Sequence, residues 1–166
     1  ADLRVDRLAL GGSRLTEVAL RLTPIDSGSS RAGWDVAVRA KELAGGIEIP
    51  GTDEASVRVA LERLDLLAVQ DAPNNVASTT PVSPVAEPFP GLPPIDVRIA
   101  RLSWGDALLG TLELDLRSDA LGLRLPSIRL LGEGVLSAAG EAAWRRSESG
   151  GRSELSIRVE SPDSGV

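Results

Sequence analysis

Carboxylates are the side chains of this sequence best suited to acid-base chemistry, which needs titratable groups held close together. The candidates are Asp2, Asp6, Glu17, Asp35, Asp65 and Asp115. They lie in or beside runs in which apolar and polar residues alternate, so we expect them on the solvent-exposed face of β-strands. A hydrated carboxylate near an arginine of the next strand is typical of a cross-strand ion pair. We therefore predict structural rather than catalytic carboxylates.

The sequence also lacks the residues that most other kinds of catalytic site require. Lys41 is the only lysine, and its place near a strand end favours a solvated charge over an amine nucleophile. Cysteine and histidine are absent. Thiolate nucleophiles, Ser-His-Asp triads and the commonest metal ligands are thereby excluded. We expect no enzyme, no metal and no cofactor.

Charge and hydropathy narrow the possible partners. The 18 Lys and Arg residues are outnumbered by 24 Asp and Glu, for a net charge of −6, which argues against nucleic acid. No apolar run approaches the roughly 20 residues of a membrane span. Methionine is absent even at position 1, which is typical of a piece of a longer protein.

The elements that carry these residues are predicted to be β-strands. Apolar and polar residues alternate with a period of two at 18–22, 34–38, 57–61, 97–99, 112–116 and 155–159. Glycine-rich turn signals separate the runs, among them Gly45-Gly46 and Gly132-Glu133-Gly134. An all-β antiparallel meander is expected, although 56–68 would also suit a short helix.

A proline-rich stretch divides the chain. Seven of the 11 prolines fall within 70–94, where they can neither continue a helix nor donate to a β-ladder. We interpret 1–69 as a first β-repeat unit, 70–94 as a linker or loop, and 95–166 as a second unit, with one continuous sheet as an alternative.

The two units resemble each other at a constant offset of 94 residues. Residues 1–8 align with 95–102, and Leu20 aligns with Leu114. In both copies the alternation slips by one residue, which predicts a β-bulge in each. A repeated hairpin unit favours an elongated architecture that grows by adding units.

The alternation also predicts which apolar side chains share one face of the sheet. They are Val18, Leu20, Leu22, Val36, Val38, Ile47, Ile49, Val57, Val59, Val97, Ile99, Leu112, Leu114, Leu116, Leu123 and Leu125. Such a face can be the interior of a β-sandwich or an open surface, because the sequence does not say what covers it.

A succession of short motifs resembles the YhdP family of AsmA-like proteins. The first unit carries GWDVAV at 33–38, LAGGIEIP at 43–50 and VRVALERLDL at 57–66. The second carries LPPIDV at 92–97, LSWG at 102–105 and AGEAAW at 139–144. The resemblance covers nearly the whole chain.

This resemblance implies both a fold and a function. Members are anchored in the inner membrane of Gram-negative bacteria and have a periplasmic part built of repeated β-groove units, the β-taco. The family is implicated in moving phospholipid toward the outer membrane. By this resemblance, the apolar face would be an open trough for phospholipid acyl chains, continued by neighbouring repeats of the full-length chain.

Two other functions stay open. One is a structural or assembly β domain of the envelope with a closed core and no lipid. The other is a glycan-binding domain, for which Trp34, Trp104 and Trp144 supply little aromatic surface, since a Trp on a strand more often packs in a core or at a sheet end.

Overall fold

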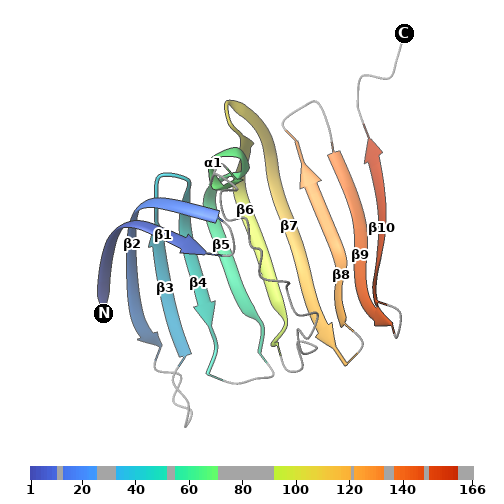
Figure 1. The fold of residues 1–166 in the computed structure, drawn as a ribbon, viewed down its shortest axis with the longest axis horizontal. Coiled ribbons are helices and arrows are strands. Elements are labelled where there is room, and N and C mark those ends of the chain that lie inside the picture. Colours follow the sequence, from blue (N-terminus) through green and yellow to red (C-terminus); the bar gives the residue numbers. More distant parts are fainter. Residues whose placement is uncertain are drawn as a thin grey trace.

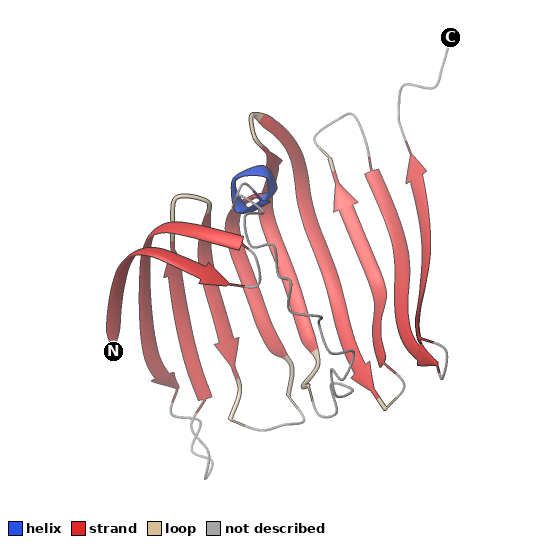
Figure 2. Ribbon diagram, viewed as in Figure 1, coloured by secondary structure: helices blue, strands red, loops and turns tan. Residues whose placement is uncertain are grey.

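The computed structural model describes residues 1–10, 13–25, 33–51, 55–70, 92–120, 122–132, 137–147 and 150–160. These residues form one open ten-stranded sheet whose strands follow one another in sequence order (Figure 1). The all-β fold class is confirmed, and a curved, groove-like sheet is consistent with it (Figure 2).

The strands divide into two runs of five. The first run comprises β1 (Asp2–Leu10), β2 (Ser13–Ile25), β3 (Gly33–Arg39), β4 (Leu43–Ile49) and β5 (Val57–Asp65). A short helix, α1 (Leu66–Gln70), follows. The second run comprises β6 (Ile95–Trp104), β7 (Ala107–Asp119), β8 (Gly122–Leu131), β9 (Ser137–Ser147) and β10 (Gly150–Glu160).

The two runs join through a parallel pair, which corrects the expected uniform antiparallel meander. Val59 of β5 pairs with Val97 of β6 in parallel, whereas the other pairs of neighbouring strands are antiparallel. A parallel partner requires the chain to return along the length of the strand, which a hairpin turn cannot do. The proline-rich stretch lies at this point, and its residues 71–91 are outside the described part of the chain.

One local prediction is corrected and one alternative is resolved. Gly45-Gly46 lies inside β4 instead of forming a turn, and the β4–β5 register shifts between Ala44 and Gly45. The segment that could have been a helix is β5, and only its continuation is helical.

The internal repeat has a structural counterpart. β2 and β7 begin and end at an offset of 94 residues, at Ser13 and Ala107 and at Ile25 and Asp119. The β-bulge predicted for the second copy is confirmed by register shifts on either side of Leu102. In the first copy the paired residues of β1 and β2 keep one register, and the irregularity is the left-handed backbone of Glu17, with φ of 52°.

The buried core is small and lies where β1 and β2 bend over the sheet. Leu15, Val18 and Ala40 form its buried cluster, and Val69 of α1 packs against them. Figure 1 shows the bent hairpin and α1 on the same side of the sheet. The bent hairpin covers one corner of this face of the sheet.

Candidate functional site

One face of the sheet is apolar across its full width. The strand pairing aligns its side chains in two rows that run across the strands. The lower row contains Leu22, Val36, Ile47, Val59, Val97, Leu114, Ile128, Gly140 and Ile157. The upper row contains Leu3, Leu20, Val38, Gly45, Leu61, Ile99, Leu112, Leu130, Ala138 and Val159. Each member is directly opposite the next, and none is polar.

The sixteen apolar positions predicted from the alternation differ in burial. Val18, Val38 and Ile99 are buried, Ile49 is exposed, and the others are half-buried. The described segments that lie over this face are α1 and the bent hairpin (Figure 1). The face is therefore a covered core near β2 and an accessible apolar surface toward β10.

The sixteen predicted positions omit several apolar members of these rows. Leu3, Leu61, Ile157 and Val159 were left out although they lie in regular strands, and Ile128 and Leu130 of β8 were missed for another reason. The β8–β9 register shifts between Leu125 and Ile128, so these two residues share a face with Leu125 despite their even numbering. Pro126 inside the run was the available signal, because proline within a strand often marks a bulge.

The opposite face is charged and carries the cross-strand ion pairs. Arg21 pairs with Asp2 at 2.9 Å, and Arg98 with Glu113 at 3.5 Å, each pair directly opposite in the register. The hydrogen bond and charge of Arg21 lower the pKa of Asp2. The structural interpretation of the carboxylates holds here, because each ion pair links adjacent strands at the solvent side of the sheet.

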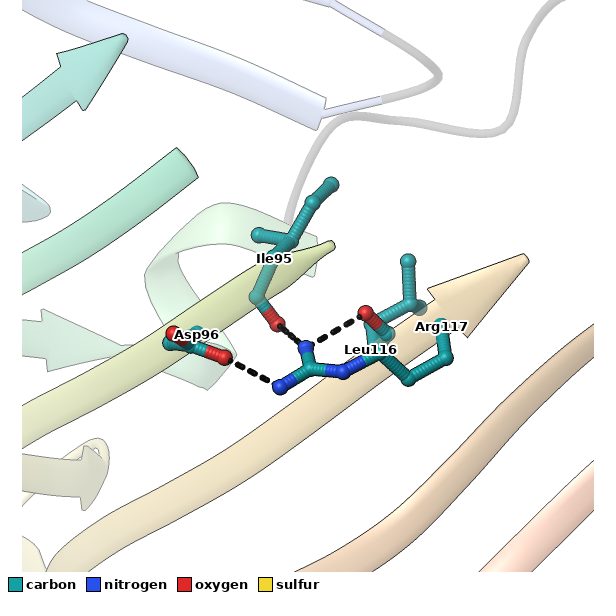
Figure 3. A network of polar contacts seen from close by, with 4 residues as sticks. All are labelled: Ile95, Asp96, Leu116 and Arg117. Carbon is teal, nitrogen blue, oxygen red and sulfur yellow. Dashed lines mark hydrogen bonds and ion pairs between the residues drawn. The ribbon is translucent and has the colours of Figure 1, made fainter. Parts of the chain in front are cut away.

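A denser polar network joins β6 to β7. The guanidinium of Arg117 donates to an Asp96 carboxylate oxygen at 2.8 Å and to the backbone oxygens of Ile95 at 3.2 Å and Leu116 at 2.9 Å (Figure 3). The hydrogen bond from Arg117 lowers the pKa of Asp96. This network stabilises the pairing of β7 with β6, the strand that follows the parallel junction.

Asp65 was predicted to take part in a cross-strand ion pair, and the structure gives its carboxylate a different role. Its Oδ1 atom accepts the N–H groups of Leu67 and Ala68, as a helix N-cap does, and the N–H of Gly105 in the β6–β7 turn. The bond from Gly105 is the largest cause of its lowered pKa. Asp65 thus holds α1 beside the end of β6, above the apolar face.

The largest described hollow is on the charged face and does not select a ligand by charge. It has a volume of about 540 Å³ and is lined by Arg117, Arg124, Arg145, Glu141 and Glu154, among others. Arg124 pairs with Asp119 at 3.0 Å, as Arg117 pairs with Asp96. Because Arg117 and Arg124 have carboxylate partners and Glu141 and Glu154 line the same hollow, it offers no concentrated positive charge to an anion.

Two of the three tryptophans lie at strand ends, and Trp144 lies within β9. Trp34, at the start of β3, and Trp104, at the end of β6, are exposed, and Trp144 is half-buried. Since β3, β6 and β9 are not neighbours in the sheet, the three side chains do not form a stacking platform for a sugar ring. Among the described residues, no group of acidic side chains could hold a metal ion, and no helix is long and apolar enough to cross a membrane.

The comparisons with known proteins give one match. The family model described as YhdP protein matches residues 1–166. Neither the curated proteins nor the solved structures include a match to this chain.

Proposed function

The chain belongs to the YhdP family, and from this premise we propose that it is a segment of a periplasmic bridge that moves phospholipid between the inner and outer membranes. Acyl chains would lie against the two apolar rows, and headgroups would stay near the solvent at the strand ends. The full-length protein would be anchored in the inner membrane of a Gram-negative bacterium, with neighbouring repeats extending the face.

The observation that carries this proposal is the continuity of the rows across the parallel junction. Val59 and Val97 adjoin in the lower row, and Leu61 and Ile99 adjoin in the upper row. An apolar chain moving across β5 would therefore meet the same kind of surface on β6. A structural domain with a closed core would also have continuous rows but would cover them, whereas Ile157 and Val159 at the β10 end of the rows are exposed.

The chemistry of the rows suits movement better than storage. Burial of apolar area contributes about 25 cal/mol per Å² whatever the position of the methylene groups. The rows contain aliphatic residues, Ala and Gly, and offer no hydrogen-bonding side chain that would fix a headgroup at one place. Binding would then be non-specific, and successive positions along the rows would have similar energies.

The decisive experiment measures phospholipid on the purified protein by native mass spectrometry, before and after delipidation and re-exposure to mixed phospholipids. Leu114→Glu places a carboxylate in the middle of the lower row, on a half-buried side chain. We expect it to remain folded and to lose bound lipid. Val36→Asp, in the same row on β3, tests the first unit in the same way.

The matched control is Ala139→Glu. Ala139 is exposed on the charged face, directly opposite Arg129 and Arg158, so the added carboxylate meets two positive charges. This variant should bind lipid as the unchanged protein does. Unfolding of both row variants would mean a closed core, and a folded protein that holds no lipid in either arm would favour the structural or assembly domain.

A further inference from the structure

The outer edge of β10 has the features of a strand edge that accepts another strand. β10 has 11 residues and no proline, and it pairs with β9 in one uninterrupted register. Its apolar residues Leu155, Ile157 and Val159 are 66, 52 and 57% exposed. Edge strands that must stay unpaired are usually short, bulged or interrupted by proline. A long, regular and partly apolar edge is instead suited to β-strand addition.

The molecule itself contains a template for that addition. β5 ends the first run of five strands as β10 ends the second, and the two strands have equivalent places in the apolar rows. Val59 and Ile157 both lie in the lower row, and Leu61 and Val159 both lie in the upper row. β5 is paired in parallel by the first strand of the next run, β6. By the same geometry, β10 would be paired in parallel by the first strand of a following unit.

The β5–β6 pair also indicates the register in which a strand would be added to β10. Val97 of β6 lies beside Val59, and Ile157 takes the place of Val59 in β10. At the offset of 94 residues that relates the two runs, Leu3 of β1 corresponds to Val97 of β6. A strand with the pattern of β1 would therefore place its equivalent of Leu3 beside Ile157.

A second copy of this chain fits that register poorly because of charge. It would set Arg4 opposite Arg158 and Asp6 opposite Glu160, two like-charged pairs side by side. Like charges directly opposite in a sheet are destabilising. The internal junction avoids the first conflict, since Arg98 of β6 faces Ala60 of β5.

We propose that Arg158 and Glu160 make the β10 edge selective: it accepts, in parallel, the first strand of a unit of the same build but of different sequence, and it excludes a second copy of this chain. This inference rests on the proposed function, in which neighbouring repeats extend the apolar face. The fitting strand has an acidic or small residue opposite Arg158 and a basic or neutral residue opposite Glu160. The edge charges thereby discriminate between the strands that could pair with β10.

A four-protein charge cycle tests both the register and the exclusion. The proteins are the unchanged chain, the β10 variant Arg158→Glu/Glu160→Arg, the β1 variant Arg4→Glu/Asp6→Arg, and the combination of both changes. All four residues are on the charged face or at its edge, away from the apolar rows, and circular dichroism checks that each variant is folded. Sedimentation velocity over a concentration series at low salt gives the molecular mass.

The unchanged chain and the combined variant should remain monomeric, because both would oppose like charges. Each single-strand variant should form head-to-tail oligomers that dissociate as salt screens the new ion pairs. Since the chain has no cysteine, Leu3→Cys with Ile157→Cys in the β10 variant adds a position check, and oxidation should cross-link successive copies.

Three results would overturn the proposal. They are head-to-tail association of the unchanged chain, failure of both folded single-strand variants to associate, and association of the combined variant as strongly as its parents. The experiment contains no lipid, so its failure is distinguishable from failure of the lipid-loading test.

Discussion

The carboxylate of Glu42 binds Thr16 at two points across the bend of the sheet. Glu42 lies in the β3–β4 turn and is buried, and its Oε2 atom accepts the Thr16 backbone N–H at 3.0 Å. Its Oε1 atom accepts the Thr16 hydroxyl. The backbone oxygen of Thr16 in turn accepts the N–H of Lys41 at 3.1 Å. These bonds hold β2 where it turns over the apolar face, next to the small core.

The first prediction concerns the pH dependence that Glu42 confers. Burial is the largest single influence and raises the pKa of this carboxyl, but the hydrogen bonds from Thr16 and the Glu42 backbone, with the charge of Lys41, together outweigh burial and leave the pKa below its ordinary value. A carboxyl with a lowered pKa stabilises the fold above its unfolded value, and the contribution is lost as the pH falls through the folded value. Glu42→Gln should cost about 1–2 kcal/mol at pH 7.

Urea titrations at pH 7 and below pH 4 measure this effect. The difference between the Glu42→Gln variant and the unchanged protein should shrink on acidification, because the unchanged protein then loses the same charge. Glu48→Gln serves as the control, since Glu48 is exposed and pairs with Arg58 only at 3.6 Å. An equal loss of stability at both pH values would show that the Glu42 charge does not contribute.

The second prediction concerns the attachment of α1. Asp65→Ala removes the acceptor shared by Leu67, Ala68 and Gly105. A helix of this length is not stable without its cap and its packing. Amide hydrogen exchange should accelerate at 66–70 and at the β6–β7 turn, while the exchange of β8 and β9 stays unchanged. Protection retained at 66–70 would show that packing of Val69 alone holds the helix.

The apolar face was predictable from the sequence because side-chain direction in a strand has a strict period of two. That rule assigned Val36, Val38 and Leu114 to one face without any tertiary information. The rule fails where a β-bulge changes which positions of a strand face the apolar side, and Ile128 and Leu130 were missed for that reason.

Other features depend on contacts between residues distant in the sequence. The parallel β5–β6 junction depends on how the chain connects the end of β5 to the start of β6, and periodicity contains no information about that connection. The roles of Glu42 and Asp65 depend on Thr16 and Gly105, which are 26 and 40 residues away. A glycine pair looks like a turn in sequence, whereas Gly45 serves a close approach between strands.

The third prediction uses that glycine and its neighbour as a matched pair. Gly45 has φ of 154°, and an added Cβ would lie 2.3 Å from the backbone oxygen of Ala60. At Gly46 the nearest atom, the backbone oxygen of Val36, is 3.8 Å away, an ordinary contact. Gly45→Ala should therefore lower the free energy of unfolding by roughly 1–3 kcal/mol.

Gly46→Ala should change the stability by less than about 0.5 kcal/mol, because it introduces neither strain nor a clash. Chemical denaturation of the two variants decides the matter. Equal effects of the two substitutions would mean that β4 and β5 can separate at Gly45 at little cost, and that the register shift there is not fixed by close approach.

The last prediction separates the core from the accessible part of the apolar face. Val18 is 1% exposed within the cluster under the bent hairpin, so Val18→Glu would bury a carboxylate with no partner and should cost about 3–5 kcal/mol. Leu114 is half-buried, and the carboxylate of Leu114→Glu can reach water, so its cost should stay below about 2 kcal/mol. Thermal unfolding followed by circular dichroism measures both. A similar loss in the two variants would mean that the rows near β7 are covered as completely as the core, and acyl chains would then have no open surface on which to move.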